Sequence, residues 1–317
     1  YLLIKRFFYR IAVRSRLTFL KFLSKHKKNN ADSPQAVVPS EGLGLITVPD
    51  AGEGQEKTDK NADFSAFYAL AELLNVSVER IKDECCLFQI RNVMKRLGKV
   101  IVRYNVTDAE LSDVFLNCAA LEIKEILVSP AYISACRKQV GRHGLNSLYV
   151  GSVIDFPFGE STFKSKLADV KDGIAEGVDG VTVVFPAMML DKDRRKEFKK
   201  QVAKTGRLYK KEARVALAAT ELSEESVKFA FKTAEKSKID GLIFIFGEIG
   251  EKELKDKMRE INAYRGKKPV RVLGNVKTPE AVMSLIKLGV DEIFTPYADD
   301  IGKDLAERFK IKSLKLR

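Results

Sequence analysis

The sequence predicts an α/β protein with a (β/α)8 barrel and an N-terminal helical extension. Two observations carry this prediction. Eight short, apolar, β-branched runs follow one another from Val100 onward, and amphipathic segments of helical period separate them. Nearly continuous apolar runs are expected where helices bury both faces of a parallel sheet. The predicted strands are Val100–Val106, Glu125–Ser129, Ser147–Ile154, Gly180–Phe185, Ala213–Ala219, Gly241–Phe246, Val270–Leu273 and Glu292–Thr295.

The segments between these runs predict the outer helices. Ser223–Ser237, Glu251–Tyr264 and Pro279–Leu288 each have a clear apolar stripe at helical spacing. Because no antiparallel hairpin signal interrupts the alternation, a closed barrel is favoured over other sheets. No glycine-rich G-x-G-x-x-G motif follows the first strand, which counts against a dinucleotide-binding sheet.

The chain divides into four predicted parts. Residues 1–28 predict a basic amphipathic leader helix, and residues 29–61 a disordered linker rich in Pro, Gly, Ser, Asp and Glu. Residues 62–98 predict a helical extension that packs on the barrel, with helices over Asp63–Leu74 and Ser77–Leu97. Residues 99–317 predict the barrel itself. The chain opens with Tyr1 rather than Met, so its natural start is expected to lie upstream.

Charge is concentrated in the leader. The net charge is +13, and residues 1–28 hold nine basic residues and no acid, which leaves +4 for the rest of the chain. An arc free of charge holds Ile4, Phe7, Phe8, Ile11 and Phe19. A basic amphipathic helix of this kind fits an anionic membrane surface, an organelle targeting peptide or an acidic partner. An extension without order until it meets a partner remains the alternative.

Composition excludes several classes of protein. No apolar run reaches the length of a transmembrane helix. The four cysteines (Cys85, Cys86, Cys118 and Cys136) have neither metal-ligand nor disulfide-framework spacing, which favours a cytoplasmic protein, peripheral at a membrane if the leader binds one. A basic run at Lys192–Lys196 and Lys199–Lys200 indicates a solvated helix face, with a patch for nucleic acid or an acidic partner as the weaker alternative.

Four motifs, in order and at matching spacing, make residues 100–310 similar to the deoxyribose-phosphate aldolase family, a group of class I aldolase-type TIM barrels. The first is a phenylalanine-proline-x-glycine turn followed by Ser161, Thr162 and Lys166. The others surround the fourth, fifth and seventh strands. The four stretches are Phe156–Gly159, Ala175–Pro186, Arg214–Glu225 and Leu273–Ala281.

The resemblance implies an imine mechanism, and this chain departs from it at each chemical position. The family's Schiff-base lysine, at the end of strand six, falls on Ile243, whose alkyl side chain has no lone pair to attack a carbonyl. The second lysine falls on Arg271, which keeps the charge but does not deprotonate. The proton-shuttling aspartate falls on Thr182, the strand-five glutamate on Ala218, and the strand-one acid on Arg103.

The phosphate-binding end departs as well. The family uses backbone amides of turns after strands seven and eight. Here the first turn is Gly274-Asn275, and the second is Phe294-Thr295-Pro296-Tyr297, where Pro296 has no amide hydrogen. The candidate ligand-binding residues are Arg271, Gly274, Asn275, Thr295 and Glu248, the last expected to point into the barrel mouth beside Arg271.

These losses predict a non-catalytic aldolase-like barrel that binds, scaffolds or regulates. The alternative is a divergent carbon–carbon lyase of the same type acting on a small phosphorylated sugar. A third hypothesis is another barrel enzyme that uses Asp155, Glu221, Glu248 and Arg271. We expect no cofactor and no metal. The expected partners are a small phosphorylated ligand, a second copy of the chain, and a membrane surface or acidic partner at residues 1–28. Nucleic acid is the less favoured partner.

Overall fold

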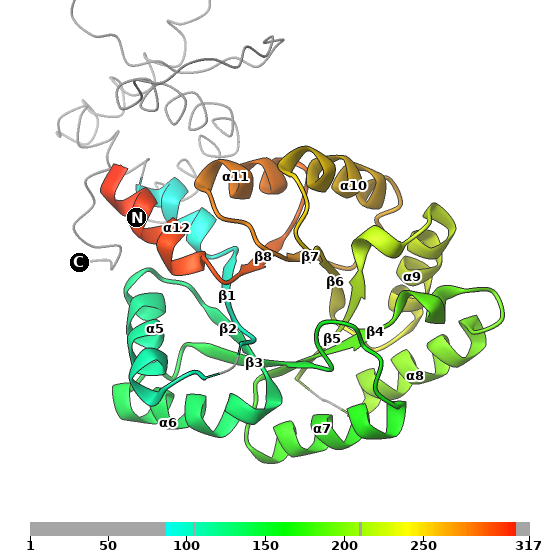
Figure 1. Cartoon of the computed structure of the whole chain (residues 1–317), viewed down its shortest axis with the longest axis horizontal. Coiled ribbons are helices and arrows are strands. Elements are labelled where there is room, and N and C mark those ends of the chain that lie inside the picture. Colours follow the sequence, from blue (N-terminus) through cyan, green and yellow to red (C-terminus); the bar gives the residue numbers. More distant parts are fainter. Residues whose placement is uncertain (1–86, 104, 209–210, 309–317) are drawn as a thin grey trace, which may run out of the picture. The chain divides into compact units, whose positions relative to one another are not determined.

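The computed structural model describes residues 87–103, 105–208 and 211–308. Eight parallel strands close into a barrel in which each strand pairs with its neighbours in the sequence and β8 pairs with β1. Figure 1 shows the strands at the centre of a ring of helices. The predicted (β/α)8 barrel is therefore confirmed. The leader and the linker predicted over residues 1–61, and the helical extension as far as residue 86, lie outside the described residues.

The strands are short and almost fully buried, because helices cover their outer faces and side chains fill the interior. They are β1 Leu97–Ile101, β2 Glu125–Val128, β3 Tyr149–Ile154, β4 Gly180–Phe185, β5 Glu212–Ala218, β6 Gly241–Ile245, β7 Val270–Leu273 and β8 Glu292–Thr295. Three of the predicted strands have the observed bounds, three others differ by one or two residues at one end, and the fifth is shifted by one residue at both ends.

Eight α-helices follow the strands among the described residues. They are α5 Asp108–Ala120, α6 Ile133–His143, α7 Phe163–Ala175, α8 Arg195–Leu208, α9 Glu224–Lys236, α10 Glu251–Ala263, α11 Pro279–Lys287 and α12 Ala298–Arg308, with short 3-10 turns η3 Pro130–Tyr132, η4 Ala187–Leu190 and η5 Ala219–Glu221. Four of these helices begin at a Ser or Thr whose side chain accepts a hydrogen bond from the first turn, namely Thr107, Thr162, Ser223 and Thr278.

Among the strands, the first has the predicted bounds that differ most from the observed ones. It begins at Leu97, three residues before the predicted start, because Leu97 to Lys99 already pair with Ile293 to Thr295 of β8. It ends at Ile101 instead of Val106, so that the chain can reach Thr107, the N-cap of α5. The preceding helix ends at Met94 in consequence, rather than running to Leu97.

Side chains at alternate strand positions point into the barrel and form two layers of different chemistry. The layer at the amino ends of the strands is polar, with the charged residues Glu125, Glu212, Arg214, Arg271 and Glu292 and the neutral Tyr149. The layer toward the carboxyl ends is apolar, with Val100, Leu127, Val153, Val184, Ala216, Ile243, Ile245, Leu273 and Phe294. The carboxyl ends are where barrels of this class place their chemistry.

Candidate functional site

The position that corresponds to the imine lysine lies inside the apolar layer. Ile243 is the third of five residues in β6 and is completely buried. It packs in one cluster with side chains from all eight strands, and partly buried Val102 and Phe156 cover the same cluster. Ile243 is therefore enclosed by apolar side chains and has no contact with solvent.

Thr182 and Ala218 stand where the resemblance implies an aspartate and a glutamate. Neither side chain is ionisable. Thr182 is the third residue of β4 and 1% exposed. Among the described residues its hydroxyl has no hydrogen-bond partner. Ala218 ends β5 and precedes η5. Neither side chain can move a proton at neutral pH.

Arg271 does not lie at the mouth, so its expected place beside Glu248 was wrong. It is the second residue of β7 and pairs in the ladder with Glu292, the first residue of β8. Its guanidinium contacts Glu292 and also Glu212, the first residue of β5, at 2.9 Å. Glu248 is exposed in the loop after β6, at the other end of the strands. Strand direction separates the two residues, which sequence spacing alone did not reveal.

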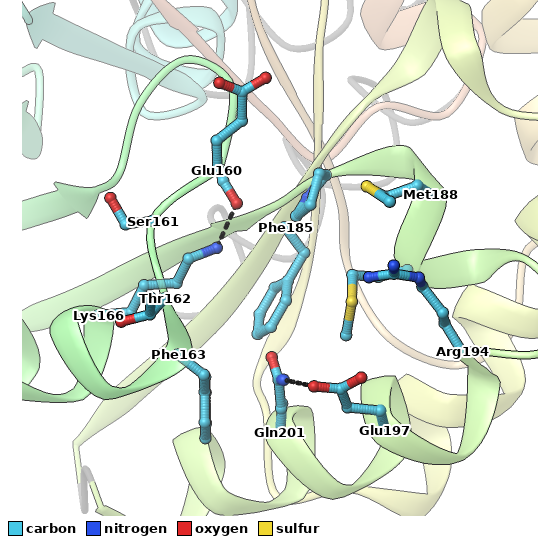
Figure 2. A pocket seen from close by; sticks show the side chains of 13 residues that line it. Glu160, Ser161, Thr162, Phe163, Lys166, Phe185, Met188, Arg194, Glu197 and Gln201 are labelled. Carbon is cyan, nitrogen blue, oxygen red and sulfur yellow. Dashed lines mark hydrogen bonds between the residues drawn. The ribbon is translucent and has the colours of Figure 1, made fainter.

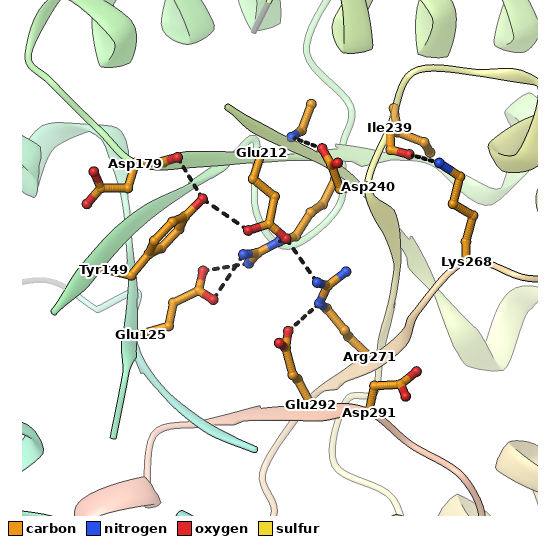
Figure 3. Close-up of polar contacts among 12 residues, drawn as sticks. Glu125, Tyr149, Asp179, Glu212, Ile239, Asp240, Lys268, Arg271, Asp291 and Glu292 are labelled. Carbon is orange, nitrogen blue, oxygen red and sulfur yellow. Dashed lines mark hydrogen bonds and ion pairs between the residues drawn. The ribbon is translucent and has the colours of Figure 1, made fainter. Parts of the chain in front are cut away.

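Arg271 belongs to an ion-pair network that fills the amino end of the barrel (Figure 3). Arg214 is 2% exposed, and its guanidinium binds both carboxylate oxygens of Glu125, at 2.5 and 2.9 Å. It also donates to Glu212 at 2.7 Å, and Tyr149 donates to Glu212 at 3.1 Å. Burial acts to raise the pKa of Glu212, but Arg214 and Arg271 outweigh burial and hold this pKa below its usual value.

Two glycines make room for this network. A Cβ added to Gly241 would collide with the Arg271 guanidinium and lie 2.9 Å from the Pro269 carbonyl oxygen. A Cβ added to Gly180 would collide with the Tyr149 hydroxyl. The network is thus a packed plug with each charge paired, which makes it a structural feature rather than an open site.

Gly274 and Thr295 lie in the neighbouring turns after β7 and at the end of β8. Their polar groups form hydrogen bonds between these two segments. The Gly274 amide donates to the Phe294 carbonyl at 3.0 Å, and the Thr295 hydroxyl donates to the Val276 carbonyl at 2.7 Å. The Thr295 hydroxyl also accepts from the Tyr297 amide at 3.2 Å. Of the candidate ligand-binding residues, Asn275 and Glu248 are exposed and remain accessible.

The remaining sequence candidates are not gathered into one site. Arg103 lies beyond β1 and is exposed, with its guanidinium 2.9 Å from Glu110. Glu221 is exposed in η5. Among the described residues, no group of three or more His, Cys, Asp and Glu could hold a metal ion. In the same part of the chain, no helix combines the length and apolarity that crossing a membrane requires.

Asp155 instead forms a buried pair that the sequence did not predict. The Asp155 carboxylate lies 3.1 Å from Nζ of Lys166, whose side chain is only 3% exposed. The same Nζ donates to the carbonyls of Gly159 at 2.6 Å and Val184 at 2.7 Å. Asp155 also accepts from the amide and the hydroxyl of Ser161, both at 2.8 Å. The phenylalanine-proline-x-glycine turn and Lys166 were the sequence signal for this arrangement.

Lys166 lies on the wall of a cavity of about 380 Å³ outside the barrel axis, between the β3 and β4 loops and helices α7 and α8. Its Nζ lies 4.9 Å from the centroid of the Phe185 ring, which forms part of the same wall. Figure 2 shows Arg194, Glu197 and Gln201 on the α8 side of this space. Burial lowers the pKa of Lys166, and Asp155 offsets this effect only in part.

No protein-family model matches the chain. It is 22% identical over 213 residues to a deoxyribose-phosphate aldolase of Caldicellulosiruptor saccharolyticus, covering 65% of this chain and 94% of the relative. A second such aldolase, of Bacillus cereus, is 26% identical over 94 residues, which cover 30% of this chain and 41% of that protein.

Solved structures give the same likeness. An aldolase called QR15 superimposes with a TM-score of 0.61 at 18% identity, covering 69% of this chain and 98% of that one. A deoxyribose phosphate aldolase from Aeropyrum pernix, described as a unique tetramer, superimposes with a TM-score of 0.60 at 15% identity, covering 69% and 96%. The barrel described here therefore has the TIM-barrel fold of these structures, and its sequence is similar to those of deoxyribose-phosphate aldolases.

Proposed function

We propose that this barrel does not carry out imine-based aldol chemistry and acts instead as a binding, scaffolding or regulatory protein. The proposal rests on one observation, the apolar layer that surrounds completely buried Ile243. An amine nucleophile needs a lone pair and access to a carbonyl carbon. The position of the family's imine lysine offers neither.

Imine trapping tests this proposal directly. The full chain is incubated with 2-deoxyribose 5-phosphate and acetaldehyde, reduced with borohydride, and analysed by intact mass. We expect no covalent adduct, because no lysine of the described residues belongs to the apolar cluster around Ile243. The aldolase of Caldicellulosiruptor saccharolyticus, treated in parallel, checks that the reaction conditions trap an imine. A reduced adduct on a single lysine of this chain would contradict the proposal.

A divergent lyase acting on a small phosphorylated sugar is the second candidate, and Lys166 favours it. This lysine has a lowered pKa, a neighbouring carboxylate and a cavity at its side. However, its Nζ already has three oxygen partners, all of which would lose a donor if an imine formed. That satisfied geometry is why we rank the lyase second.

Two variants separate these candidates if an adduct appears. Lys166→Met removes the amine at the cavity, and Lys99→Met is the matched control, because Lys99 is also buried and paired, with Asp299. A lyase that uses Lys166 would lose its adduct in the first variant and keep it in the second. Loss in both variants would indicate misfolding, which thermal unfolding measurements would detect.

The proposal includes a ligand, an oligomeric state and a location in the cell. A small phosphorylated ligand would meet the exposed Asn275 and Glu248 rather than Arg271. Assembly into a homodimer is consistent with the tetramer described for the Aeropyrum pernix aldolase. We place the protein in the cytoplasm, at a membrane surface if residues 1–28 bind one.

A further inference from the structure

Helix α8 carries a continuous stripe of positive charge on its outer face. At 100° per residue, Lys196, Lys199, Lys200, Ala203, Lys204 and Arg207 occupy one arc of about 140°. All five basic residues in this arc are exposed, and the arc contains no acid. The opposite face buries Phe198, Val202, Thr205 and Gly206 against the barrel. We call these five basic residues the α8 stripe.

Aromatic rings from the two neighbouring helices lie beside two members of the stripe. Lys199 Nζ lies 5.2 Å from the centroid of Phe229, on α9, and Lys204 Nζ lies 5.9 Å from that of Phe163, on α7. Such contacts hold lysine stems against the protein and leave the ammonium groups in solvent. Among the described residues, none of the five forms a salt bridge within 4.0 Å. Their positive charges are therefore not paired with carboxylates of the protein.

The composition of the stripe favours diffuse attraction over directional recognition. Four of its five members are lysines, which are compact, strongly hydrated point charges. Bidentate recognition of single phosphates or carboxylates uses arginine instead. No exposed aromatic side chain lies within the arc, although stacking on aromatic rings is typical of single-stranded nucleic acid sites.

The shape of this region favours a flat partner. Figure 1 shows α8 on the convex outer ring of helices, between α7 and α9. From Lys196 to Arg207 the stripe runs for about 16 Å along the helix axis, at 1.5 Å per residue. A plane can touch a convex ring along one such helix over its whole length, so that all five charges reach it together.

We propose that the α8 stripe docks the barrel on an anionic lipid surface. The attraction is between lysine ammonium groups and lipid headgroup phosphates and carboxylates, and it adds to any contribution of the basic residues 1–28. The inference does not depend on whether the barrel is catalytic. Self-association through the stripe is disfavoured, because two copies would bring like charges together.

Vesicle partitioning of the full chain tests this proposal. The first variant combines Lys196→Gln, Lys200→Gln and Lys204→Gln on α8. The matched control combines Lys228→Gln, Lys232→Gln and Lys236→Gln, three exposed α9 lysines at the same spacing but interleaved with glutamates. Both variants lose three charges and retain residues 1–28, and glutamine preserves helix propensity.

Lipid titrations use vesicles of phosphatidylcholine with and without phosphatidylserine, at low and high salt. Each basic residue near an anionic surface contributes about fivefold to partitioning. We expect the α8 variant to bind phosphatidylserine vesicles at least tenfold more weakly than the parent and the control to stay within about threefold. Binding of the parent should fall at high salt, because the exposed charges are screened.

Two outcomes would overturn the proposal. Equal partitioning of the α8 variant and the control would show that the stripe is only a solvated face. Polarisation assays with a fluorescent single-stranded oligonucleotide and with a poly-glutamate peptide test the other polyanions. If the α8 variant loses one of these partners while its vesicle binding is unchanged, the stripe recognises that partner and not lipid.

Discussion

The two ends of the barrel interior are filled by side chains of opposite character, charged at one end and apolar at the other. The amino end holds two arginines and three glutamates in a paired network, whereas the carboxyl end, where barrels carry out catalysis, is filled with aliphatic side chains and Phe294. In aldolases the charged groups would be expected at the carboxyl end. Arg271 shows what this difference means. A basic residue on the strand that carries a family lysine can bind a ligand at the mouth only if it also lies at the carboxyl end of that strand.

Breaking the charged network should have the largest effect on stability. Arg214→Met leaves Glu125 and Glu212 buried without their main cation, and we expect a loss of about 3–5 kcal/mol in the free energy of unfolding. Ile243→Val, in the apolar layer, should cost only about 0.5–1.5 kcal/mol. Urea denaturation of both variants measures the contrast.

A double variant checks the cause of that loss. Adding Glu125→Gln to Arg214→Met removes one of the stranded charges, so the combined cost should be smaller than the sum of the two single costs. Simple additivity would mean that the two side chains do not act as a pair.

Crowding the network should have the next largest effect. Gly241→Ala places a methyl group against the Arg271 guanidinium and the Pro269 carbonyl, and we expect it to destabilise the protein by about 1–3 kcal/mol. Gly247→Ala, in the loop after the same strand, is the control, because nothing lies within 4 Å of an added Cβ there. Thermal unfolding of the two variants should differ clearly; similar melting temperatures would mean that Arg271 has room to move.

Ionisation of Asp179 should have a smaller effect on stability than the changes to the charged network, and this effect should depend on pH. Asp179, in the loop before β4, accepts from the Val150 amide at 3.0 Å and from Arg137 at 2.5 Å. Burial opposes ionisation, but these donors hold the pKa of Asp179 below its usual value. A depressed carboxyl pKa stabilises the fold above the unfolded-state pKa of about 3.9, and this stabilisation is lost as the pH falls through the folded-state pKa.

Asp179→Asn should therefore cost about 1.5 kcal/mol at pH 6 and progressively less as the pH falls below the unfolded-state pKa of about 3.9. Denaturant unfolding at several pH values measures the difference between the parent and the variant. Asp300→Asn, an exposed carboxyl near the start of α12, serves as the control. A difference that stays constant down to pH 2 would show that the charge on Asp179 does not stabilise the fold.

The sequence was sufficient for the barrel because period and spacing are local properties. Runs such as Gly180–Phe185 must be buried on both faces, and caps such as Thr278 define where helices begin. The predicted position of the first strand was wrong because this strand pairs with β8, whose residues lie almost two hundred positions further along the chain. No local pattern around Leu97 reports that partner.

The site was harder to predict because its geometry depends on depth within the barrel. Alignment of motifs assigned the family's two lysine positions to Ile243 and Arg271, and these two residues pair in the β6–β7 ladder. It did not indicate that Arg271 meets Glu212 from β5. Likewise the Asp155–Lys166 pair depends on a turn that folds the chain back on itself between the two residues. These contacts follow from the closed sheet and not from sequence spacing.

The smallest expected effect concerns a buried polar side chain in the middle of β4. Thr182 is buried in β4, and its hydroxyl has no partner among the described residues. An unpaired buried hydroxyl carries a desolvation cost, so Thr182→Val, which keeps the shape of the side chain, should stabilise the protein by about 1 kcal/mol. Ser152→Ala is a comparison at a second buried, unpartnered hydroxyl, on β3. If Thr182→Val instead destabilises the protein by a similar amount, the hydroxyl has a bound partner, and the carboxyl end of the barrel holds a polar molecule after all.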